Sequence, residues 1–330
     1  MIELRDVHKT YRVIKSRPGL GATIRNLFAP SYSYVKALQG VSFTIGEGEL
    51  VGLIGENGAG KSTLVKIATG ILHPSGGTVL LDGKSVHDHR KECALKFGVA
   101  FGQRRALWWQ LSARESLQAL GRIYRVPSSE IAGRIEQLVE VFELGRFVDM
   151  PVRQMSLGQR IRCEVAGALV HRPKIVYLDE PTIGMDVLAK IKMREYLKRI
   201  NREDGVSVLL TSHDLFDVER LCERALILDG GRLILDETFE ALREKFCGSR
   251  VLRLNLASPI DDGRLDGIDG IEVMPGEDRW RLKILFDPVK RPVMGLITEL
   301  GRRLDIVDFM VEDLPIDEFV AEIYRTRGER

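Results

Sequence analysis

The segment Gly55–Ser62 has the residue types and the spacing of a phosphate-binding loop, G-x-x-x-x-G-K-[ST]. Its glycines let the backbone curl so that successive N–H groups point at phosphate oxygens, and a following helix adds the partial positive charge of its N-terminus. Lys61 is expected to neutralise the β- and γ-phosphates, and Ser62 to ligate Mg²⁺. The expected nucleotide-binding residues of this loop are Gly55, Glu56, Asn57, Gly58, Ala59, Gly60, Lys61, Ser62 and Thr63.

Two adjacent carboxylates, Asp179 and Glu180, follow the apolar run Ile175–Leu178. A buried strand would deliver both to its carboxyl end, where ligands collect in open α/β sheets. Asp179 is expected to hold Mg²⁺, mostly through water, and Glu180 to polarise the attacking water as general base. Such a run is common by itself, but downstream of a phosphate-binding loop it indicates hydrolysis of a nucleoside triphosphate.

A third segment, Met155–Gln159, lies between these two motifs and suggests a second anion site. Ser156 can cap a helix that continues through Ile161 and Val165, which leaves free N–H groups at the helix N-terminus to meet an anion. The alternative is an ordinary capped helix that binds no ligand.

This third segment is similar to the signature sequence of the ABC transporters, usually Leu-Ser-Gly-Gly-Gln, with Met for the first Leu and Leu for the first Gly. Together with the other two motifs, it makes residues 1 to about 240 resemble the ABC transporter nucleotide-binding domain. The resemblance implies that Ser156, Gly158 and Gln159 of one protomer face the γ-phosphate bound by the other protomer.

Four further positions acquire roles only through this resemblance. Tyr11 would stack on adenine, Gln103 would meet Mg²⁺, Asp186 would end the D-loop and His213 would contact the γ-phosphate. Taken alone, Tyr11 is more readily a core aromatic and His213 a structural histidine. The implied cofactors are ATP and Mg²⁺. The implied metal-site residues are Ser62, Gln103 and Asp179, and the implied catalytic residues are Glu180, His213 and Lys61.

The elements that must position these residues alternate between strands and helices, which predicts an α/β sheet. The predicted strands are Glu49–Ile54, Lys174–Leu178 and Val206–Thr211, with a hairpin of Ala225–Asp229 and Arg232–Leu235 around two glycines. The predicted helices are Lys61–Leu72, Ala113–Val126, Ser129–Leu144 and Val187–Arg202. Ser128 or Ser129 is a plausible N-cap of the third helix.

The character of the sequence changes after about residue 240. Arg250–Leu256 and Trp280–Phe286 alternate like strands, Val293–Arg302 has helical spacing, and Ile306–Val311 could be a strand before a last helix. The expected fold is therefore an α/β P-loop NTPase domain of the ABC type with a helical subdomain, residues 1–240. A small α+β accessory domain, residues 241–330, is expected to follow it.

Length and composition limit the class of protein. The 330 residues allow one large and one small domain, and the content of 44% hydrophobic and 29% charged residues is typical of globular proteins. A net charge of +2 argues against a protein built around nucleic acid, so no such partner is expected.

The expected location is cytoplasmic. No apolar stretch approaches the roughly 18 residues of a membrane-spanning helix, and the first residues lack a basic-then-apolar signal pattern. Cys93, Cys163, Cys222 and Cys247 lie far apart without a CxxC pair, which favours reduced and packed thiols.

Several segments resemble the ATPases of exporters with separate ABC-2-type permeases: Phe101–Arg104 with Leu107–Trp109, the signature Ser156–Arg160, and Glu180–Asp186. The resemblance implies a homodimer, or a heterodimer with a close paralogue, on the inner face of the cell membrane. This dimer would power the export of drugs, lipids or similar amphiphiles through the separate permease subunits.

Two other functions stay open. The basic segment from Arg12 to Lys36, with Ala37–Phe43 after it, is also similar to ATPases that export teichoic acid or lipid-linked polysaccharide. Those often carry a C-terminal sugar-binding β-sandwich, for which the last residues look too helical and too short. A soluble ABC ATPase of translation or DNA repair is the lower-ranked alternative, because the chain has a single phosphate-binding loop and no sustained heptad run.

Two surface features carry alternatives as well. In the basic segment, Leu20, Ile24, Leu27 and Phe28 share one helical face, so it is either a membrane-surface element or a solvated loop. Trp108–Trp109 is either part of the core or a contact with the membrane subunit.

Overall fold

The computed structural model describes residues 1–14, 32–101, 106–212, 215–246, 250–260, 265 and 268–313 of the 330-residue chain. The chain divides into two compact units, Met1–Glu237 and Thr238–Arg330. Within the described ranges, no helix is both long enough and apolar enough to span a lipid bilayer.

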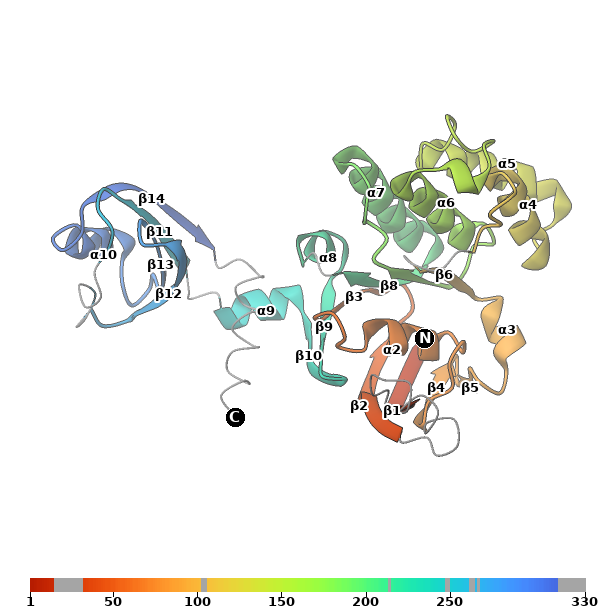
Figure 1. Ribbon diagram of the computed structural model, residues 1–330, viewed down its shortest axis with the longest axis horizontal. Helices are drawn as coiled ribbons and strands as arrows, with labels where there is room; N and C mark the ends of the chain where they lie inside the picture. The colour runs from red at the N-terminus through yellow and green to blue at the C-terminus, as the bar shows by residue number, and fades with distance from the viewer. Residues whose placement is uncertain are drawn as a thin grey trace, which may run out of the picture. The chain divides into compact units, whose positions relative to one another are not determined.

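The first unit contains a six-stranded sheet of strand order β10-β9-β3-β8-β7-β6 (Figure 1). Its strands are β3 (Leu50–Ile54), β6 (Phe97–Phe101), β7 (Ile175–Asp179), β8 (Ser207–Ser212), β9 (Arg224–Asp229) and β10 (Arg232–Thr238). β3 is parallel to β8 and β9, and β7 is parallel to β6 and β8. Nearly all residues of β3, β7 and β8 are buried, as is usual for central parallel strands. Because these strands run in one direction, their carboxyl ends meet at one edge of the sheet.

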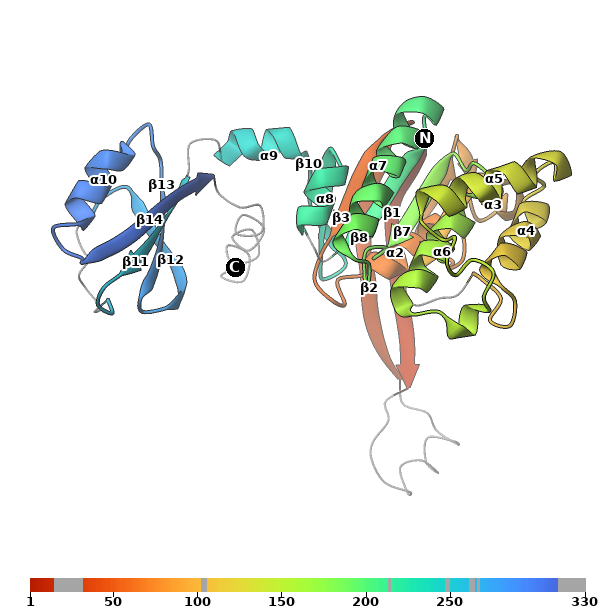
Figure 2. The same cartoon turned by 90° about the horizontal axis from the view of Figure 1, so that it is seen from above.

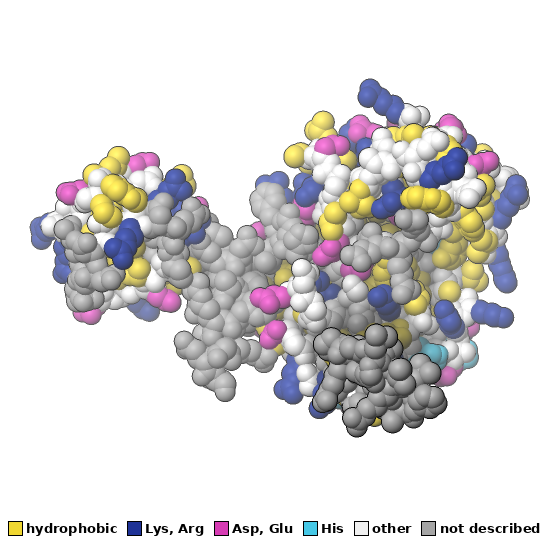
Figure 3. Space-filling view, in the orientation of Figure 1, with side chains coloured by type: hydrophobic (Ala, Val, Ile, Leu, Met, Phe, Trp, Pro, Cys, Tyr) yellow, Lys and Arg dark blue, Asp and Glu magenta, His cyan; other side chains and the backbone are white. Residues whose placement is uncertain are grey.

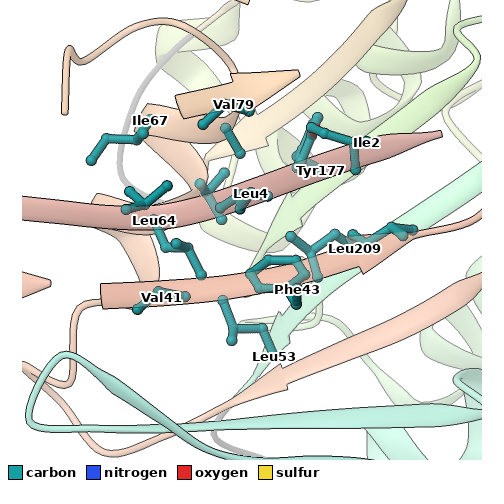
Figure 4. Packing of buried hydrophobic residues seen from close by; sticks show 14 of the residues in the cluster. Ile2, Leu4, Val41, Phe43, Leu53, Leu64, Ile67, Val79, Tyr177 and Leu209 are labelled. Atoms are coloured by element: carbon teal, nitrogen blue, oxygen red, sulfur yellow. The ribbon is translucent and has the colours of Figure 1, made fainter. Parts of the chain in front are cut away.

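A second sheet of the same unit has the order β2-β1-β4-β5. Its strands are β1 (Ile2–Ile14), β2 (Tyr32–Ile45), β4 (Gly76–Leu81) and β5 (Lys84–Ser85), and β1 is antiparallel to β2 and β4. Figure 4 shows the core where this sheet meets the first helix and the central strands, with Ile2, Leu4, Val41, Phe43, Leu53, Leu64, Ile67, Val79, Tyr177 and Leu209. The helix α2 (Lys61–Ala68) therefore shares one hydrophobic core with strands of both sheets.

The helices of the first unit are α2 (Lys61–Ala68), α3 (Arg90–Ala94), α4 (Ala113–Ile123), α5 (Ser128–Val141), the 3₁₀ turn η1 (Val152–Gln154), α6 (Leu157–Leu169), α7 (Val187–Asp204) and α8 (Leu215–Leu221). α2 begins directly after the loop that follows β3. α4 contacts α5 and α6, and α6 contacts β6 and β7, so these three helices form a group beside the β6 edge (Figures 1 and 2). The mixed α/β fold with a helical subdomain, predicted from the sequence, is confirmed.

The second unit contains a four-stranded antiparallel sheet of order β12-β13-β11-β14. Its elements are α9 (Phe239–Phe246), β11 (Arg250–Leu256), β12 (Ile271–Asp278), β13 (Arg281–Phe286), α10 (Val293–Leu300) and β14 (Ile306–Asp313). α10 packs on one face of the sheet and forms a separate core with Leu252, Leu254, Ile284, Phe286, Leu296 and Leu300. This unit therefore has its own hydrophobic core.

Predicted helix ends differ from the structure for a common reason. α4 ends at Ile123 instead of Val126, and α5 ends at Val141 instead of Leu144. A residue with positive φ follows each helix, and the next N–H bonds back to the last turn, from Val126 to Gly121 and from Leu144 to Val139 at 2.9 Å each. The apolar residue after such a turn packs back on its helix, so it imitates the helical spacing. α2 likewise ends at Ala68, four residues early, before Gly70 with φ 72°.

Two further predictions are wrong. α5 begins at Ser128 itself, so neither Ser128 nor Ser129 is its N-cap; that position is Pro127, without a side-chain cap. The basic insertion is also shorter than the predicted range of 12–36, because its ends belong to paired strands, with Thr10 opposite Lys36 and Ile14 opposite Tyr32. The predicted helical face of Leu20, Ile24, Leu27 and Phe28 lies outside the described residues, as does the predicted last helix.

Candidate functional site

A cavity of about 580 Å³ lies at the carboxyl edge of the six-stranded sheet. It is lined by Ala37, Asn57, Gly58, Gly60, Lys61, Ser62, Thr63, Lys66, Phe101, Asp179 and Glu180. The loop after β3 and the two carboxylates after β7 therefore face one cavity. The sequence predicted these two groups of residues separately, and the parallel strands bring them together.

The loop between β3 and α2 is held in place by its surroundings. Gly60 has φ 108°, and a Cβ at this position would lie 2.6 Å from the carbonyl oxygen of Ala37, so only glycine fits without displacing the backbone. The N–H of Gly231 donates to Ala59 O at 3.0 Å, and the N–H of Gln39 donates to Gly231 O at 2.8 Å. β2 and the β9–β10 hairpin thus brace the loop from outside.

Lys61 is buried with only 7% of its surface exposed. Its Nζ donates to the carbonyl oxygens of Gly55 at 2.5 Å and Glu56 at 3.0 Å. Burial lowers the pKa of Lys61, and the nearby charges of Glu180 and Asp179 offset part of this effect. The ammonium group therefore lies within the loop, next to the cavity where a phosphate would be bound.

The side-chain oxygens of Ser62 and Asp179 lie close together at the edge of the cavity. Ser62 Oγ donates to Asp179 Oδ2 at 3.0 Å, and Thr211 Oγ1 donates to the other oxygen, Oδ1, at 2.5 Å. A hydroxyl and a carboxylate are hard oxygen donors of the kind that Mg²⁺ prefers, usually with several waters and phosphate oxygens completing its octahedron. The donor set therefore fits Mg²⁺.

Glu180 has an unusual backbone conformation. Its φ is 54°, in the left-handed region that costs a residue with a side chain about 1–3 kcal/mol. Its N–H donates to Thr211 O at 3.0 Å and lies 3.2 Å from Thr211 Oγ1. The strained turn directs Glu180 to the cavity wall, where a general base for an attacking water is required.

Tyr11 lies on β1, beside the loop but not among the residues that line the cavity. Its hydroxyl is 3.4 Å from Oγ1 of Thr63, and Nζ of Lys9 lies 5.4 Å from the centroid of its ring. Tyr11 is therefore a neighbour of the phosphate-binding helix rather than part of the hydrophobic core.

The signature segment forms a capped helix. Ser156 Oγ accepts from Gln159 N at 3.3 Å, and Gln159 Oε1 accepts from Ser156 N at 2.9 Å, so α6 has a complete capping box. None of Ser156, Gly158 and Gln159 lines the cavity. Within one chain, the signature and the phosphate-binding loop therefore do not share this site.

The D-loop packs against the signature of the same chain. A Cβ on Gly158 would lie 2.0 Å from the carbonyl oxygen of Gly184, so the two backbones are in direct contact. Asp186 caps α7 by accepting from Ala189 N at 2.9 Å, and this hydrogen bond lowers the pKa of its carboxyl. Signature and D-loop thus form one surface.

Two predicted site residues, Gln103 and His213, lie outside the described residues. Other residues of the site were missed. Thr211 orients both Asp179 and Glu180, and its position at the end of a strand, two residues before His213, was a usable signal. Lys66 lines the cavity one helical turn after Ser62, which helical spacing could have shown. Ala37 approaches only through the fold and has no local signal.

Trp108 and Trp109 are exposed at 41% and 38%, so of the two alternatives considered for them, a place in the core is excluded. Leu111 is similarly exposed at 37% and adds to the apolar surface of the same short segment. Figure 3 shows hydrophobic side chains among basic ones on the region of the first unit that contains α4 to α6. This segment forms an exposed apolar surface next to the helical group.

Comparison with known proteins gives consistent matches. The family model described as ABC transporter matches residues 38–183. The ABC transporter ATP-binding protein NatA of Bacillus subtilis is 36% identical over 217 residues, which is 66% of this chain and 88% of that protein. The daunorubicin resistance ATP-binding protein DrrA3 of Streptomyces coeruleorubidus is 32% identical over 67% of this chain and 69% of that protein. The Nod factor export ATP-binding protein I of Ralstonia nicotianae is 34% identical over 66% of this chain and 68% of that protein.

Solved structures are similar as well. A dimeric ATP-binding cassette in a post-hydrolysis state with ADP and Pi matches with a TM-score of 0.61 and 30% identity, over 72% of this chain and 98% of that one. The ATP-binding subunit of an ABC transporter matches with a TM-score of 0.63 and 26% identity, over 74% and 93%. Both similarities cover most of the compared cassette.

Proposed function

The chain belongs to the ABC transporter ATP-binding proteins and is an ATPase, and we propose that its ATP hydrolysis powers export through separate membrane subunits of the ABC-2 type. The observation that carries the ATPase chemistry is the arrangement of Ser62, Asp179 and Glu180 around one cavity. Relatives named for daunorubicin resistance and Nod factor export support the direction of transport.

The described residues divide the reaction between them. Lys61 and the loop amides bind the phosphates of ATP, which aligns the γ-phosphate for attack. Ser62 and Asp179 would hold Mg²⁺, which would supply positive charge to neutralise the phosphates. Glu180 accepts a proton from the attacking water, and Thr211 holds the backbone of Glu180 and the carboxylate of Asp179 in register.

A second copy is needed to bring a signature to the γ-phosphate. In one chain, Ser156 and Gly158 do not line the nucleotide cavity, although Ser156 starts a 13-residue helix whose N-terminus suits an anion. A partner related by a two-fold axis would place its signature over this cavity and form two identical shared sites. The dimeric cassettes among the similar structures support this arrangement. The partner is a copy of this chain or a close paralogue.

The substitution Glu180→Gln tests this function. It keeps the shape of the side chain and removes the base, so turnover should fall by about 100-fold or more while ATP still binds. With ATP and Mg²⁺ the variant should elute as a dimer in size-exclusion chromatography with light scattering. Adding Ser156→Arg should return it to a monomer. Glu140→Gln, an exposed carboxylate on α5, is the matched control and should leave turnover unchanged. If Glu180→Gln were a monomer both with and without Ser156→Arg, the shared site would be contradicted. Normal phosphate release from Glu180→Gln would contradict the role of Glu180 as general base.

The form of the second unit supports a drug, lipid or amphiphile exporter over the polysaccharide alternative. Its described residues form one four-stranded sheet with α10 on one face, and not the two facing sheets of a sugar-binding β-sandwich. A small accessory domain of this kind is the reason that we rank teichoic acid or lipid-linked polysaccharide export second.

The exposed segment with Trp108 and Trp109 supports a membrane partner over a soluble ABC ATPase. Two adjacent exposed tryptophans are typical of interface anchors. Co-expression with an ABC-2-type permease subunit encoded beside this protein, followed by co-purification, tests whether this segment contacts the membrane subunit. The double substitution Trp108→Ala/Trp109→Ala should reduce recovery of the permease about tenfold, whereas Ile123→Ala, a control at 59% exposure, should not. Equal recovery from both would remove this segment from the interface.

A further inference from the structure

A buried carboxylate ties the exposed tryptophan segment to the signature helix. Glu164 lies in the middle of α6 and is only 5% exposed. Its Oε2 accepts from the N–H of Ala106 at 2.8 Å, and its Oε1 lies 3.4 Å from the N–H of Leu107. The side chain of Leu107, 3% exposed, lies over Gly167 one turn further along α6, where a Cβ would be 3.5 Å away. The segment is thus fixed to α6 by hydrogen bonds and by packing.

The same segment is joined to the residues that precede the signature. The N–H of Trp108 donates to Ser116 Oγ at 3.3 Å, which fixes it to α4. The N–H groups of Arg153 and Val152 donate to the carbonyl oxygens of Trp109 at 3.2 Å and Leu111 at 3.0 Å. Ser156 follows three residues after Arg153. Residues 106–111 are therefore connected to the 3₁₀ turn η1, which precedes the signature helix, and to the middle of that helix.

Glu164 holds the part of this connection that packing cannot replace. A carboxylate accepts hydrogen bonds more strongly than a neutral oxygen does, and two neighbouring backbone N–H groups face it here. Without it, the buried N–H of Leu107 and the partly buried N–H of Ala106 would both lose their acceptor, so the segment would have to move toward water. Gln at this position keeps one acceptor oxygen but turns an N–H₂ group toward one of the two donors.

We infer that Glu164 is a positioning residue that makes the Trp108–Trp109 surface and the signature helix one rigid unit. A displacement of the surface by a membrane partner is then delivered to Ser156, and closure of the shared site is delivered back to the surface. This inference rests on the shared site proposed above. The side chains of Trp108 and Trp109 stay accessible because the backbone makes the connection.

Tryptophan fluorescence and amide exchange of the full chain test this inference. Three tryptophans are present, so Trp280→Phe leaves only Trp108 and Trp109 as emitters. In this background, Glu164→Ala should raise amide exchange in peptides containing residues 106–107 at least tenfold and increase acrylamide quenching about twofold. Glu164→Gln should give a smaller change of the same sign, and it provides a second variant if the alanine variant does not fold. Cys163→Ala is the matched control, because Cys163 is fully buried next to Glu164 in the same helix and its thiol lies 4.0 Å from Met155 Sδ.

The transmission is tested by adding Glu180→Gln and then ATP with Mg²⁺. Formation of the dimer should change tryptophan quenching, and Glu164→Ala should abolish this change while the dimer still forms. Unchanged exchange at 106–107, absence of a fluorescence response in the parent, or the same response with and without Glu164 would each overturn the inference. Failure of the parent to dimerise would instead overturn the shared site, and the exchange experiment, which needs no dimer, would still decide the role of Glu164.

Discussion

Ser62 Oγ, at the start of α2, lies 3.0 Å from Oδ2 of Asp179, at the end of β7. The two residues are 117 positions apart in the chain, and the hydrogen bond joins α2 to the end of β7, directly before Glu180, the proposed general base. Thr211 Oγ1 donates a hydrogen bond to the other carboxylate oxygen, Asp179 Oδ1, at 2.5 Å. Each oxygen of this carboxylate is therefore fixed, which prepares it to hold a hydrated cation at a defined position.

Asp179→Asn should weaken the use of Mg²⁺. The amide has nearly the same shape but no charge, and its N–H₂ group would face either Ser62 or Thr211. We expect the Mg²⁺ concentration for half-maximal ATPase activity to rise at least tenfold and turnover to fall on the order of 100-fold. Mg²⁺ titrations of phosphate release measure both quantities. Asp88→Asn, at an exposed position, serves as control. A wild-type Mg²⁺ dependence in Asp179→Asn would show that the metal is held elsewhere.

Gly158→Ala should separate the signature from the D-loop. The added Cβ would lie 2.0 Å from Gly184 O, a contact that only a backbone shift can relieve. Because Ser156 and the D-loop form one surface, we expect dimer formation by the Glu180→Gln protein to weaken at least tenfold, while ATP binding to the monomer stays normal. Gly133→Ala, in the middle of α5 with open space around it, should leave the dimer unchanged and raise stability by about 0.4–1 kcal/mol. A dimer of normal affinity in Gly158→Ala would contradict the role of this contact.

Stability should fall as the pH decreases from about 6.5 toward 4, in part because of His171. Burial lowers the pKa of His171 to about 4, and its Nε2 lies 2.9 Å from the carbonyl oxygen of Phe97 while its ring stacks on Tyr124. The unfolded chain takes up the proton near pH 6.5, before the folded one does, so the contribution is complete above that pH and is lost as the pH falls to 4. The contribution of His171 to the free energy of unfolding is on the order of 2–3 kcal/mol.

Urea unfolding of the wild type at pH 7 and pH 4.5 measures this loss, and His171→Gln should remove most of that difference. The glutamine can still donate to Phe97 O but does not titrate. His89→Gln, an exposed histidine, should keep the wild-type dependence. The same loss in His171→Gln as in the wild type would assign the pH dependence to other groups.

The nucleotide loop and the two carboxylates could be predicted because local chemistry dictates them. Glycine spacing, the lysine and the apolar strand before Asp179 each have a local reason, and the parallel sheet then places them at one edge. The role of Thr211 could not be predicted from local sequence in the same way. Its role depends on the register of β8 beside β7, where it lies opposite Asp179.

The differences between the predicted and the observed helices and strands also have physical causes. Val126 and Leu144 continue an apolar spacing of three and four, although each belongs to the turn after its helix. β1 and β2 were not predicted because the Arg12–Lys36 segment was interpreted from its charge, whereas Thr10–Ile14 and Tyr32–Lys36 are held by backbone pairing. The charge of a segment does not show whether its backbone pairs with another strand.

Tyr11 is expected to bind the adenine ring of ATP through its aromatic face. Its ring lies beside α2, and its hydroxyl is 3.4 Å from Thr63 Oγ1, too long for a strong hydrogen bond. Stacking of a base on an aromatic ring contributes about 1–3 kcal/mol, so Tyr11→Ala should raise the KM for ATP about tenfold. Tyr11→Phe, the matched control, keeps the ring and removes the hydroxyl, so it should stay within twofold of the wild type. Steady-state kinetics measure KM, and inhibition by inorganic tripolyphosphate, which has no base, should be equal in all three proteins. If Tyr11→Phe raised the KM for ATP as much as Tyr11→Ala does, the contact of the hydroxyl with Thr63, and not stacking of the ring, would account for the effect. If tripolyphosphate inhibition also weakened in Tyr11→Ala, the side chain would support the phosphate loop and not the base.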